Sequence, residues 1–370
     1  APTELLAEQH QLNFQQWLKP LGVQVTLLTG QMTAKSQRET LQRIASGEVQ
    51  VIIGTHALFQ DKVVFHKLAL AIIDEQHRFG VHQRMALQHK GAYPHQLVMT
   101  ATPIPRTLTM TLYADMDVSV IDELPKGRQP ITTHTAAQPK RPELIERLRK
   151  ILAQGQQAYW VCTLIEPSEE IEALSAEEAF DLLRRNLPES RVALLHGRMK
   201  GDEKVEVMRA FKAGEYQLLV ATTVVEVGVD VPNATQMFIE NAERLGLAQL
   251  HQLRGRVGRG SKASRCFLLF KPGVSQAGQH RLNALRQSQD GFYLAEQDLK
   301  LRGPGDILGT RQSGEQSFKI ADLSEHAHLM PRVVQRCETM MKAAPASSDG
   351  IYLTGLLNTW AASDNAHLSV

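Results

Sequence analysis

Two neighbouring carboxylates follow a continuous apolar run in the first third of the chain. Residues 68–73 read LALAII, and Asp74 and Glu75 come directly after them. Such a run predicts a buried strand, and ligands of open α/β sheets bind at the carboxyl ends of strands. An aspartate there can hold Mg²⁺ through its water shell, and an adjacent glutamate can orient or deprotonate an attacking water. The pair suits nucleotide hydrolysis; the alternative is an acidic pair that merely ends a strand at the surface.

Two arginines in the last third of the chain offer the complementary charge. Arg256 and Arg259 lie in QLRGRVGRG (252–260), where Gly255 and Gly258 permit close backbone approach. Placed three apart on one helical face, they could neutralise a phosphoryl group during transfer, as arginine fingers do. A solvated basic turn is the alternative.

Other chemistries find less support. His77 and His82 are five residues apart and no H-E-x-x-H motif occurs, which excludes that class of metalloprotease site. The three cysteines lie far apart and form no C-x-x-C motif, so they predict a reducing, intracellular setting instead of a disulfide or metal site.

The elements that must position the acids and arginines occur twice. Residues 25–55 match residues 192–222 at a constant offset of 167, with ten identical pairs in 31 positions and no gap. Convergence of strand–helix–strand units is one explanation. A duplicated α/β lobe is the better one, because Met32/Met199 and Gln50/Gln217 have no propensity reason to agree. Each copy predicts strand, helix and strand in a parallel sheet covered on both faces.

Proline- and glycine-rich stretches divide the sequence into further segments. DELPKGRQPI (122–131) is a Pro/Gly-rich separator, and after about residue 272 the pattern changes to a Gln-rich helix and a Gly/Pro loop. We expect lobe one at 1–124, a linker at 125–134, lobe two at 135–272 and a carboxy-terminal extension at 273–370.

The duplication predicts a single nucleotide site. At the offset of 167, Asp74 and Glu75 meet Asn241 and Ala242, so the second copy keeps the strand and loses the acids. Acids from one lobe and arginines from the other would then meet at an interface, where closure of the lobes assembles catalysis. The helix that precedes the first repeat begins only at residue 3, so we expect the chain to start inside a domain.

Bulk properties set limits on partners. The chain of 370 residues is 43% hydrophobic and 22% charged, with a net charge of +2. No apolar run reaches the roughly 18–20 residues of a membrane span, and no secretory signal precedes the first helix. We therefore expect no membrane partner, and a nucleic-acid surface would come from local placement of basic residues.

Five stretches together resemble the RecG family of bacterial superfamily 2 helicases. They are AIIDEQHRFGVHQR, MTATPIPRTL, YWVCTLIEPSEE, ATTVVEVGVDVP and QLHQLRGRVGRG, and the resemblance covers essentially the whole chain. The related transcription-repair coupling translocases share TATPIPRT, but DEQH and YWVCTLIE are closer to RecG. The resemblance implies two tandem RecA-like lobes, a carboxy-terminal helical and loop element for translocation, and the use of ATP and Mg²⁺. It also implies a monomer in the bacterial cytoplasm that acts on forks, Holliday junctions and duplex DNA, with single-stranded-DNA-binding protein as a candidate partner.

Residue roles follow from the same resemblance. It implies catalysis by Asp74, Glu75, Arg256 and Arg259, with Asp74 holding Mg²⁺ through water; nucleotide binding by Gly228, Asp230 and Gln252; coupling by Gln76, His77, Thr100, Thr102, Arg302 and Gln312; and DNA contacts by Thr55, His56, Thr222 and Thr223. For the segment 296–314, a Gly-rich cap on lobe two is the alternative to a translocation motif.

One departure from the family is the phosphate-binding loop. The G-x-x-x-x-G-K-[ST] motif is missing, and Gly-Lys occurs nowhere in the sequence. Its amides and lysine cradle the phosphates, so we expect an amino-terminally truncated form that binds ATP weakly or not at all. The parent function would be ATP-dependent translocation on DNA, driving fork remodelling. The rivals are a non-catalytic DNA- or protein-binding module, and a translocase on protein-bound or RNA-containing substrates.

Overall fold

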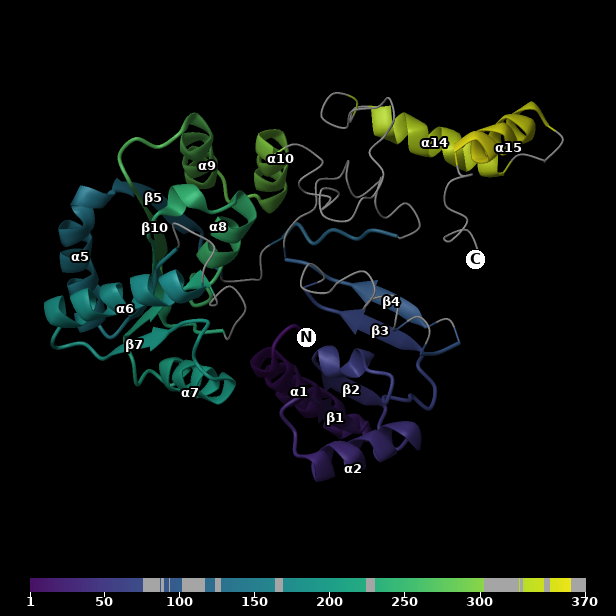
Figure 1. Cartoon of the computed structure of the whole chain (residues 1–370), viewed down its shortest axis with the longest axis horizontal. Helices are drawn as coiled ribbons and strands as arrows, with labels where there is room; N and C mark the ends of the chain where they lie inside the picture. The colour runs from purple at the N-terminus through teal and green to yellow at the C-terminus, as the bar shows by residue number, and fades with distance from the viewer. Residues whose placement is uncertain are drawn as a thin grey trace. The chain divides into compact units, whose positions relative to one another are not determined.

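The computed structural model describes most of the chain as an α/β protein (Figure 1). The described residues are 1–75, 87, 90–92, 94–101, 117–123, 128–163, 169–223, 230–302, 326, 329–342 and 347–360. The chain forms two compact units, Ala1–Pro103 with Leu124–Leu294, and Ile104–Glu123 with Ala295–Val370. The first unit contains two parallel-sheet lobes, called lobe one (1–101) and lobe two (128–294) below.

Lobe one builds on two short pairs of parallel strands. Its elements are α1 (Glu4–Leu18), η1 (Lys19–Leu21), β1 (Val25–Leu28), α2 (Ala34–Ala45), β2 (Val51–Gly54), η2 (His56–Phe59), β3 (Leu70–Ile73) and β4 (His95–Val98). Strand β1 pairs with β2, and β3 pairs with β4. Leu28 and Ile44 centre one small core, Ala71 and Ile73 another, and Phe65 packs against both.

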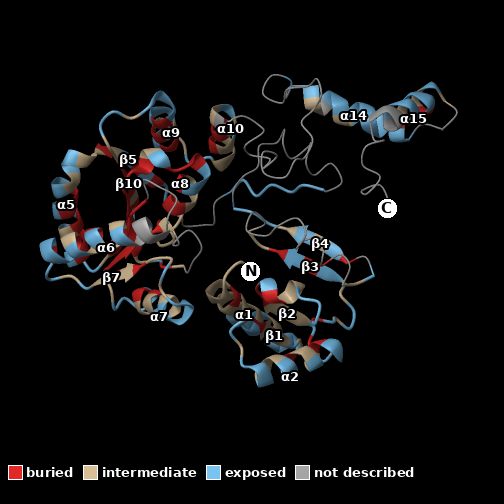
Figure 2. Cartoon of the chain, viewed as in Figure 1, coloured by how far each residue is buried: buried red, intermediate tan, exposed pale blue. Residues whose placement is uncertain are grey.

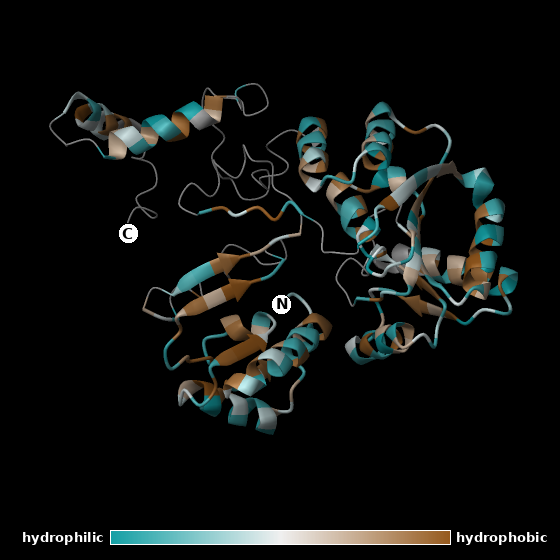
Figure 3. Ribbon diagram, turned by 180° about the vertical axis from the view of Figure 1, so that it is seen from behind, coloured by the Kyte–Doolittle hydropathy of each residue, from teal (hydrophilic) through white to brown (hydrophobic). Residues whose placement is uncertain are grey.

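Lobe two contains a six-stranded parallel sheet in the order β5-β10-β9-β6-β8-β7. Its elements are β5 (Ile131–Ala137), η4 (Gln138–Lys140), α5 (Arg141–Ala153), β6 (Gln157–Val161), α6 (Glu169–Asn186), β7 (Val192–Leu195), α7 (Gly201–Lys212), β8 (Leu218–Ala221), β9 (Ala234–Ile239), η6 (Ala242–Arg244), α8 (Leu247–Arg254), β10 (Ser264–Phe270) and α9 (Gln276–Gln287). Strand β5 starts inside the segment expected as linker. Figure 3 shows that the helices of this lobe carry both hydrophilic and hydrophobic residues.

The central strand β6 is buried on both faces of this sheet. Trp160 stacks on Phe238 with ring centroids 4.9 Å apart and shares a core with Leu148 of α5 and Leu183 of α6. Tyr159 points the other way and meets Phe211 of α7 edge-on, with centroids 5.0 Å apart. Helices therefore cover both faces, as expected for continuous apolar parallel strands, and Figure 2 shows these strands as the buried centre of lobe two.

The internal repeat is confirmed element by element. Strands β1 and β7, helices α2 and α7, and strands β2 and β8 begin and end at residues 167 apart. Their strand register is also shared, because Val25 lies opposite Val51 and Val192 lies opposite Leu218. Chance convergence of two strand–helix–strand segments would not give the same element bounds and the same strand register. The two copies are therefore repeats of the same structural motif.

The paired glutamines Gln50 and Gln217 have a physical role in this unit. Gln50 Oε1 accepts a hydrogen bond from the Gln24 amide at 2.9 Å, and Gln217 Oε1 accepts one from the Arg191 amide at 2.7 Å. Each side chain thus satisfies a backbone donor just before the first strand of its repeat. The requirement for an amide side chain of this length explains an identity that strand propensity does not.

The expected alignment of the acidic strand is wrong by one residue. Strand β3 ends at Ile73 and β9 at Ile239, and the left-handed residues that follow are Glu75 (φ 52°) and Asn241 (φ 47°). Both pairs are 166 apart, so one residue is lost between the second repeat strand and β9. Asp74 therefore corresponds to Glu240, and the second copy retains a carboxylate at this position.

The lobes differ in how their strands are joined. In lobe two, β6 lies between β8 and β9 and pairs with both. In lobe one, β2 corresponds to β8 and β3 corresponds to β9. Among the described residues, β2 pairs with β1 and β3 pairs with β4. One apolar face of the β3–β4 pair is about half exposed, with Leu70 at 52%, Ile72 at 48% and Leu97 at 48%.

The remaining described helices are α10 (Gly291–Arg302), α14 (Met330–Met341) and α15 (Ser348–Trp360). Arg336 of α14 forms a bidentate ion pair with Asp349 of α15, at 3.0 and 2.6 Å. Among the described helices, none combines the length and apolar character that a membrane span requires.

Candidate functional site

The acidic pair lies where the sequence predicts it, directly after a buried strand. Ala71 and Ile73 of β3 point into the core, which leaves Asp74 and Glu75 at the carboxyl end of the strand. The Glu75 amide donates to Asp74 Oδ1 at 2.9 Å, and Glu75 has the left-handed φ of 52°. This conformation is uncommon outside glycine and asparagine, and such strain concentrates at functional sites.

His10 of α1 is a neighbour of Asp74 that the sequence did not single out. Its Nε2 lies 3.5 Å from Asp74 Oδ2. His10 and the Glu75 amide hold the pKa of Asp74 below its ordinary value, although burial acts in the opposite direction. Asp74 is therefore ionised at neutral pH. The described residues contain no cluster of three or more metal-ligating side chains. A single carboxylate nevertheless fits Mg²⁺, which keeps several waters and often takes one or two protein oxygens beside substrate phosphates.

The arginines do not share a helical face as expected. Helix α8 ends at Arg254, with Gly255 as its cap, and Gly258 adopts φ 77°. Both arginines consequently lie in a glycine-interrupted turn beyond the helix. A β-carbon at Gly258 would lie 2.8 Å from Ile131 Cγ1, so this turn requires glycine both for its conformation and for its packing.

The turn still gathers positive charge beside Asp230. Arg259 Nη1 lies 3.6 Å from Asp230 Oδ1, and Arg259 Nε donates to the Gly255 carbonyl at 3.3 Å. Burial raises the pKa of the Tyr159 hydroxyl, while Arg256 and Arg259 lower it and Asp230 raises it further. Tyr159 of β6 therefore keeps its proton at neutral pH.

Arg128 belongs to the same group, and the sequence analysis missed it. Its Nη2 donates to the Gly255 carbonyl at 3.3 Å, so two guanidiniums share one acceptor. Arg128 stands in the Pro/Gly-rich separator, where no periodicity marks a functional position. The one available signal was a basic residue beside glycine, and that pattern is too common to be specific.

Arg254 has a structural role within the same basic stretch. It is 2% exposed, and its Nη1 donates to the Leu285 and Ser288 carbonyls at 2.7 and 2.8 Å. Those carbonyls end α9, where a cation also suits the helix dipole. Arg254 Nη2 lies 2.9 Å from His251 Nδ1. Because a guanidinium only donates, His251 must accept there.

This contact predicts a pH effect. Burial lowers the pKa of His251 to about 4, and Arg254 and Arg128 act in the same direction against Asp290. The unfolded imidazole takes up a proton near pH 6.5, so between pH 6.5 and 4 the unfolded state binds more protons. Stability should fall over that window by about 3 kcal/mol, and then level off.

Denaturant melts of the chain and of His251→Asn from pH 7 to 4 check this. The asparagine retains an acceptor near Nδ1 without titrating, so its stability should decline less over the window. Parallel declines in the two proteins would contradict the assignment.

The carboxylate that corresponds to Asp74 in lobe two is occupied by lobe two itself. Glu240 is 5% exposed, pairs with Arg141, and accepts a hydrogen bond from Trp160 Nε1 at 2.7 Å. An internal guanidinium and indole neutralise and anchor it. The prediction that lobe two has lost the acid is therefore wrong at Glu240, whereas a single nucleotide site in the chain stays a prediction.

The other predicted site residues divide by exposure. Thr55 and Thr222 occupy equivalent positions after β2 and β8, are 3% and 0% exposed, and have no hydrogen bond to the side-chain oxygen within the described structure. His56 and Thr100 are exposed, and Gln252 and Thr223 are half-buried. Arg302 ends α10, with only its backbone described. Outside the described residues lie Gln76, His77, Thr102, Gly228 and Gln312.

Comparison with known proteins assigns the chain's regions. Residues 1–111 match the DEAD/DEAH box helicase model, 143–261 the helicase conserved C-terminal domain, and 288–352 the model of ATP-dependent DNA helicase RecG, domain 3, C-terminal. The ATP-dependent DNA helicase RecG of Escherichia coli (strain K12) is 59% identical over 338 residues, which is 90% of this chain and 49% of that protein. This chain belongs to the RecG family.

Further RecG relatives and structures agree. RecG of Pasteurella multocida is 54% identical over 97% of this chain and 52% of its own length, so the chain spans about half the length of the curated relatives it matches. The structure of RecG bound to a three-way DNA junction superposes with a TM-score of 0.70 at 42% identity, over 89% of this chain and 42% of that one. The structure of Mss116p bound to single-stranded RNA and AMP-PNP, at 15% identity and a TM-score of 0.58, shows the shared fold alone.

Proposed function

We propose that this chain supplies the motor segment of an ATP-dependent double-stranded-DNA translocase that remodels branched DNA and stalled forks in repair and recombination. The observation that supports this most strongly is the RecG identity over nine-tenths of the chain, with the acids and arginines of a nucleotide site in place. The RecG structure bound to a three-way junction supports branched DNA as the substrate.

The residues divide the work by charge. Asp74, ionised and oriented by the Glu75 amide, would hold Mg²⁺, which when bound supplies charge neutralisation to the phosphates. Glu75 orients the attacking water. Arg256 and Arg259 stabilise the charge that develops on the transferred phosphoryl group. The same proposal includes DNA contacts by Thr55, His56, Thr222 and Thr223. It also includes coupling of hydrolysis to movement on DNA by Gln76, His77, Thr100, Thr102, Arg302 and Gln312. Gly228, Asp230 and Gln252 complete its nucleotide contacts.

The sequence lacks the residues that would bind the phosphates of ATP in a P-loop. A P-loop binds phosphates through successive amides and a lysine, and no Gly-Lys pair is present. Hydrolysis by the chain by itself should accordingly not exceed that of its Glu75→Gln variant, measured at steady state with DNA present.

The decisive experiment joins the chain to a P-loop-bearing segment of a RecG relative. We expect ATP hydrolysis by this chimera to be stimulated more by a replication-fork substrate than by linear duplex, and more by duplex than by RNA. Equal stimulation by all three, or preference for RNA, would reject the proposed substrate. Because a motor must ignore sequence, binding should depend steeply on salt and little on base composition.

A non-catalytic DNA-binding module is the second candidate, favoured by the missing Gly-Lys pair. It predicts salt-dependent DNA binding by the chimera that nucleotide does not alter. The geometry at Asp74 and Arg259 argues for the motor instead, since binding alone requires neither a strained acidic pair nor an arginine cluster around one carboxylate.

A further inference from the structure

The Gly255 carbonyl accepts hydrogen bonds from two cations. Arg128 Nη2 and Arg259 Nε each lie 3.3 Å from this oxygen, although they come from opposite ends of lobe two in sequence. A shared acceptor brings two like charges close together. Like-charged groups repel unless an anion lies between them, so this arrangement requires a counter-charge.

Asp230 meets that requirement incompletely. Its Oδ1 lies 3.6 Å from Arg259 Nη1, beyond hydrogen-bond length, and this buried oxygen has no hydrogen bond within the described structure. Burial lowers the pKa of Arg128, Arg259 lowers it further, and Asp230 only opposes this. One loosely placed carboxylate thus faces two guanidiniums and leaves a net positive charge.

The hydrogen bond to the Gly255 carbonyl uses only a small part of the hydrogen-bonding capacity of the Arg128 guanidinium. A guanidinium has five N–H donors in a planar fork, and the hydrogen bond found for Arg128 among the described residues uses one of them. The remaining donors suit the bidentate recognition of phosphate oxygens. A purely structural tie between the separator and the end of α8 would need neither a fork nor a charge.

We propose that Arg128 is a phosphate-binding residue that acts with Arg259, and that a polyphosphate placed between them replaces Asp230 as the counter-charge. The identity of the polyphosphate as the tail of a nucleoside triphosphate rests on the proposed function. Arg128 lies three residues before β5 in the segment between the lobes, so this contact ties occupancy of the site to the position of that segment.

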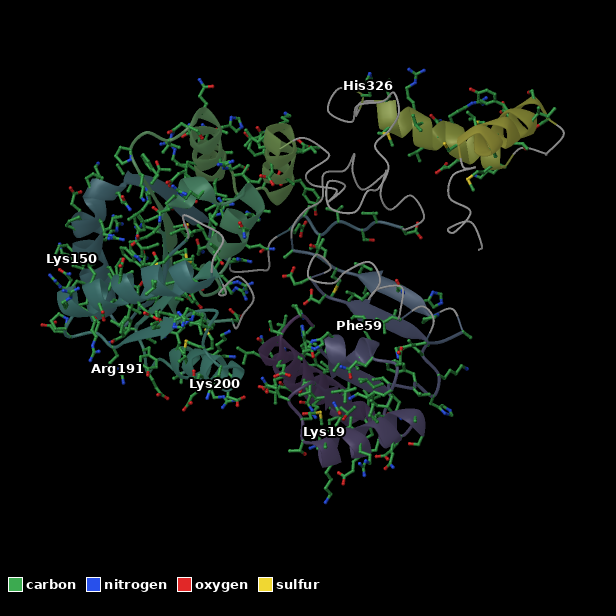
Figure 4. All side chains as sticks on the ribbon, in the orientation of Figure 1. Lys19, Phe59, Lys150, Arg191, Lys200 and His326 are labelled. Carbon is green, nitrogen blue, oxygen red and sulfur yellow. The ribbon has the colours of Figure 1, made fainter. Side chains whose placement is uncertain are left out.

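Arg191 provides a matched control. Its Nη2 donates to the Gly214 carbonyl at 3.3 Å, the same contact at the same length, but its backbone amide donates to Gln217 Oε1 in the repeat. Figure 4 labels Arg191 in lobe two. Arg128→Gln and Arg191→Gln each remove one positive charge and one such hydrogen bond. They differ in whether a second arginine shares the acceptor.

The test is calorimetric titration of the chain with magnesium-free tripolyphosphate at low salt. Loss of one charged phosphate contact should weaken binding about 10-fold in Arg128→Gln. Arg191→Gln should bind like the parent chain. Arg128→Lys retains the charge without the fork and should recover part of the loss. A structural tie would instead lower thermal stability without this ordering of affinities.

The outcomes separate this inference from the motor assignment. Equal weakening in Arg128→Gln and Arg191→Gln, or no measurable binding by the parent chain, overturns the role of Arg128. Neither result affects fork-stimulated hydrolysis by the chimera. Failure of that hydrolysis with an intact Arg128 effect would reject the motor and retain a polyphosphate site.

Discussion

Replacing Arg259 with alanine is expected to lower kcat for DNA-stimulated ATP hydrolysis by about 10³-fold in the chimera that supplies a P-loop. Arg259 is held by the Gly255 carbonyl, and Asp230 lies 3.6 Å from its Nη1, so the guanidinium is oriented before any ligand binds. A preoriented cation stabilises charge that develops in the transition state and adds less to ground-state binding. KM for ATP should therefore change much less than kcat.

Two further measurements make this prediction specific. Arg259→Ala should leave the thermal midpoint of the chain within about 4 °C of the parent, because it removes a partly exposed cation from a site of like charges. Arg259→Lys should recover only part of kcat, since a point charge does not replace a fork. If kcat stays within threefold while KM rises, Arg259 is a binding residue, and the arginine-finger role is wrong.

Replacing Arg254 with methionine should cost about 3–5 kcal/mol of unfolding free energy. Arg254 is five positions before Arg259 in the same basic stretch, but it is buried and donates to the carbonyls of Leu285 and Ser288. Its removal leaves those buried acceptors, and His251 Nδ1, without a donor. Each orphaned acceptor costs about 1–3 kcal/mol, although methionine regains some apolar packing.

Urea denaturation followed by far-UV circular dichroism measures this cost. Arg185→Met is the control, because Arg185 is an exposed arginine whose Nε also donates to a backbone carbonyl, that of Asp181, at 3.1 Å. It should lose less than about 0.5 kcal/mol. Equal losses in both variants would mean that Arg254 contributes through its charge at the surface and not as a buried cap of α9.

The sequence predicted the architecture because its signal is redundant. Buried parallel strands carry continuous apolar runs, and the repeat presents the same strand–helix–strand pattern twice, so β1, α2 and β2 are checked by β7, α7 and β8. The acidic pair was also accessible, since its place after β3 follows from strand length and the edge rule for α/β sheets.

What the sequence could not supply was contact between distant segments. Arg128 and Arg259 meet through Gly255, and neither position carries a periodic signal. The glycine turn after α8 was misassigned to a helix because spacing of three suits a helix and a turn equally, and the outcome depends on the positive φ of Gly258. The single-residue slip before β9 was likewise hidden, because an ungapped comparison cannot detect a deletion inside a loop.

The one-residue slip also changes which residues of the two copies correspond. Once Glu240 is matched with Asp74, both copies of the repeat carry a carboxylate directly after the equivalent strand. In lobe two this carboxylate, that of Glu240, is part of the structural core of the lobe, where it pairs with Arg141 and accepts a hydrogen bond from the Trp160 indole. In lobe one the corresponding carboxylate, that of Asp74, lies at the carboxyl end of β3 and accepts a hydrogen bond from the Glu75 amide. The same position in the two copies therefore carries a carboxylate with two different environments, one bound within its own lobe and one oriented by the amide of its neighbour.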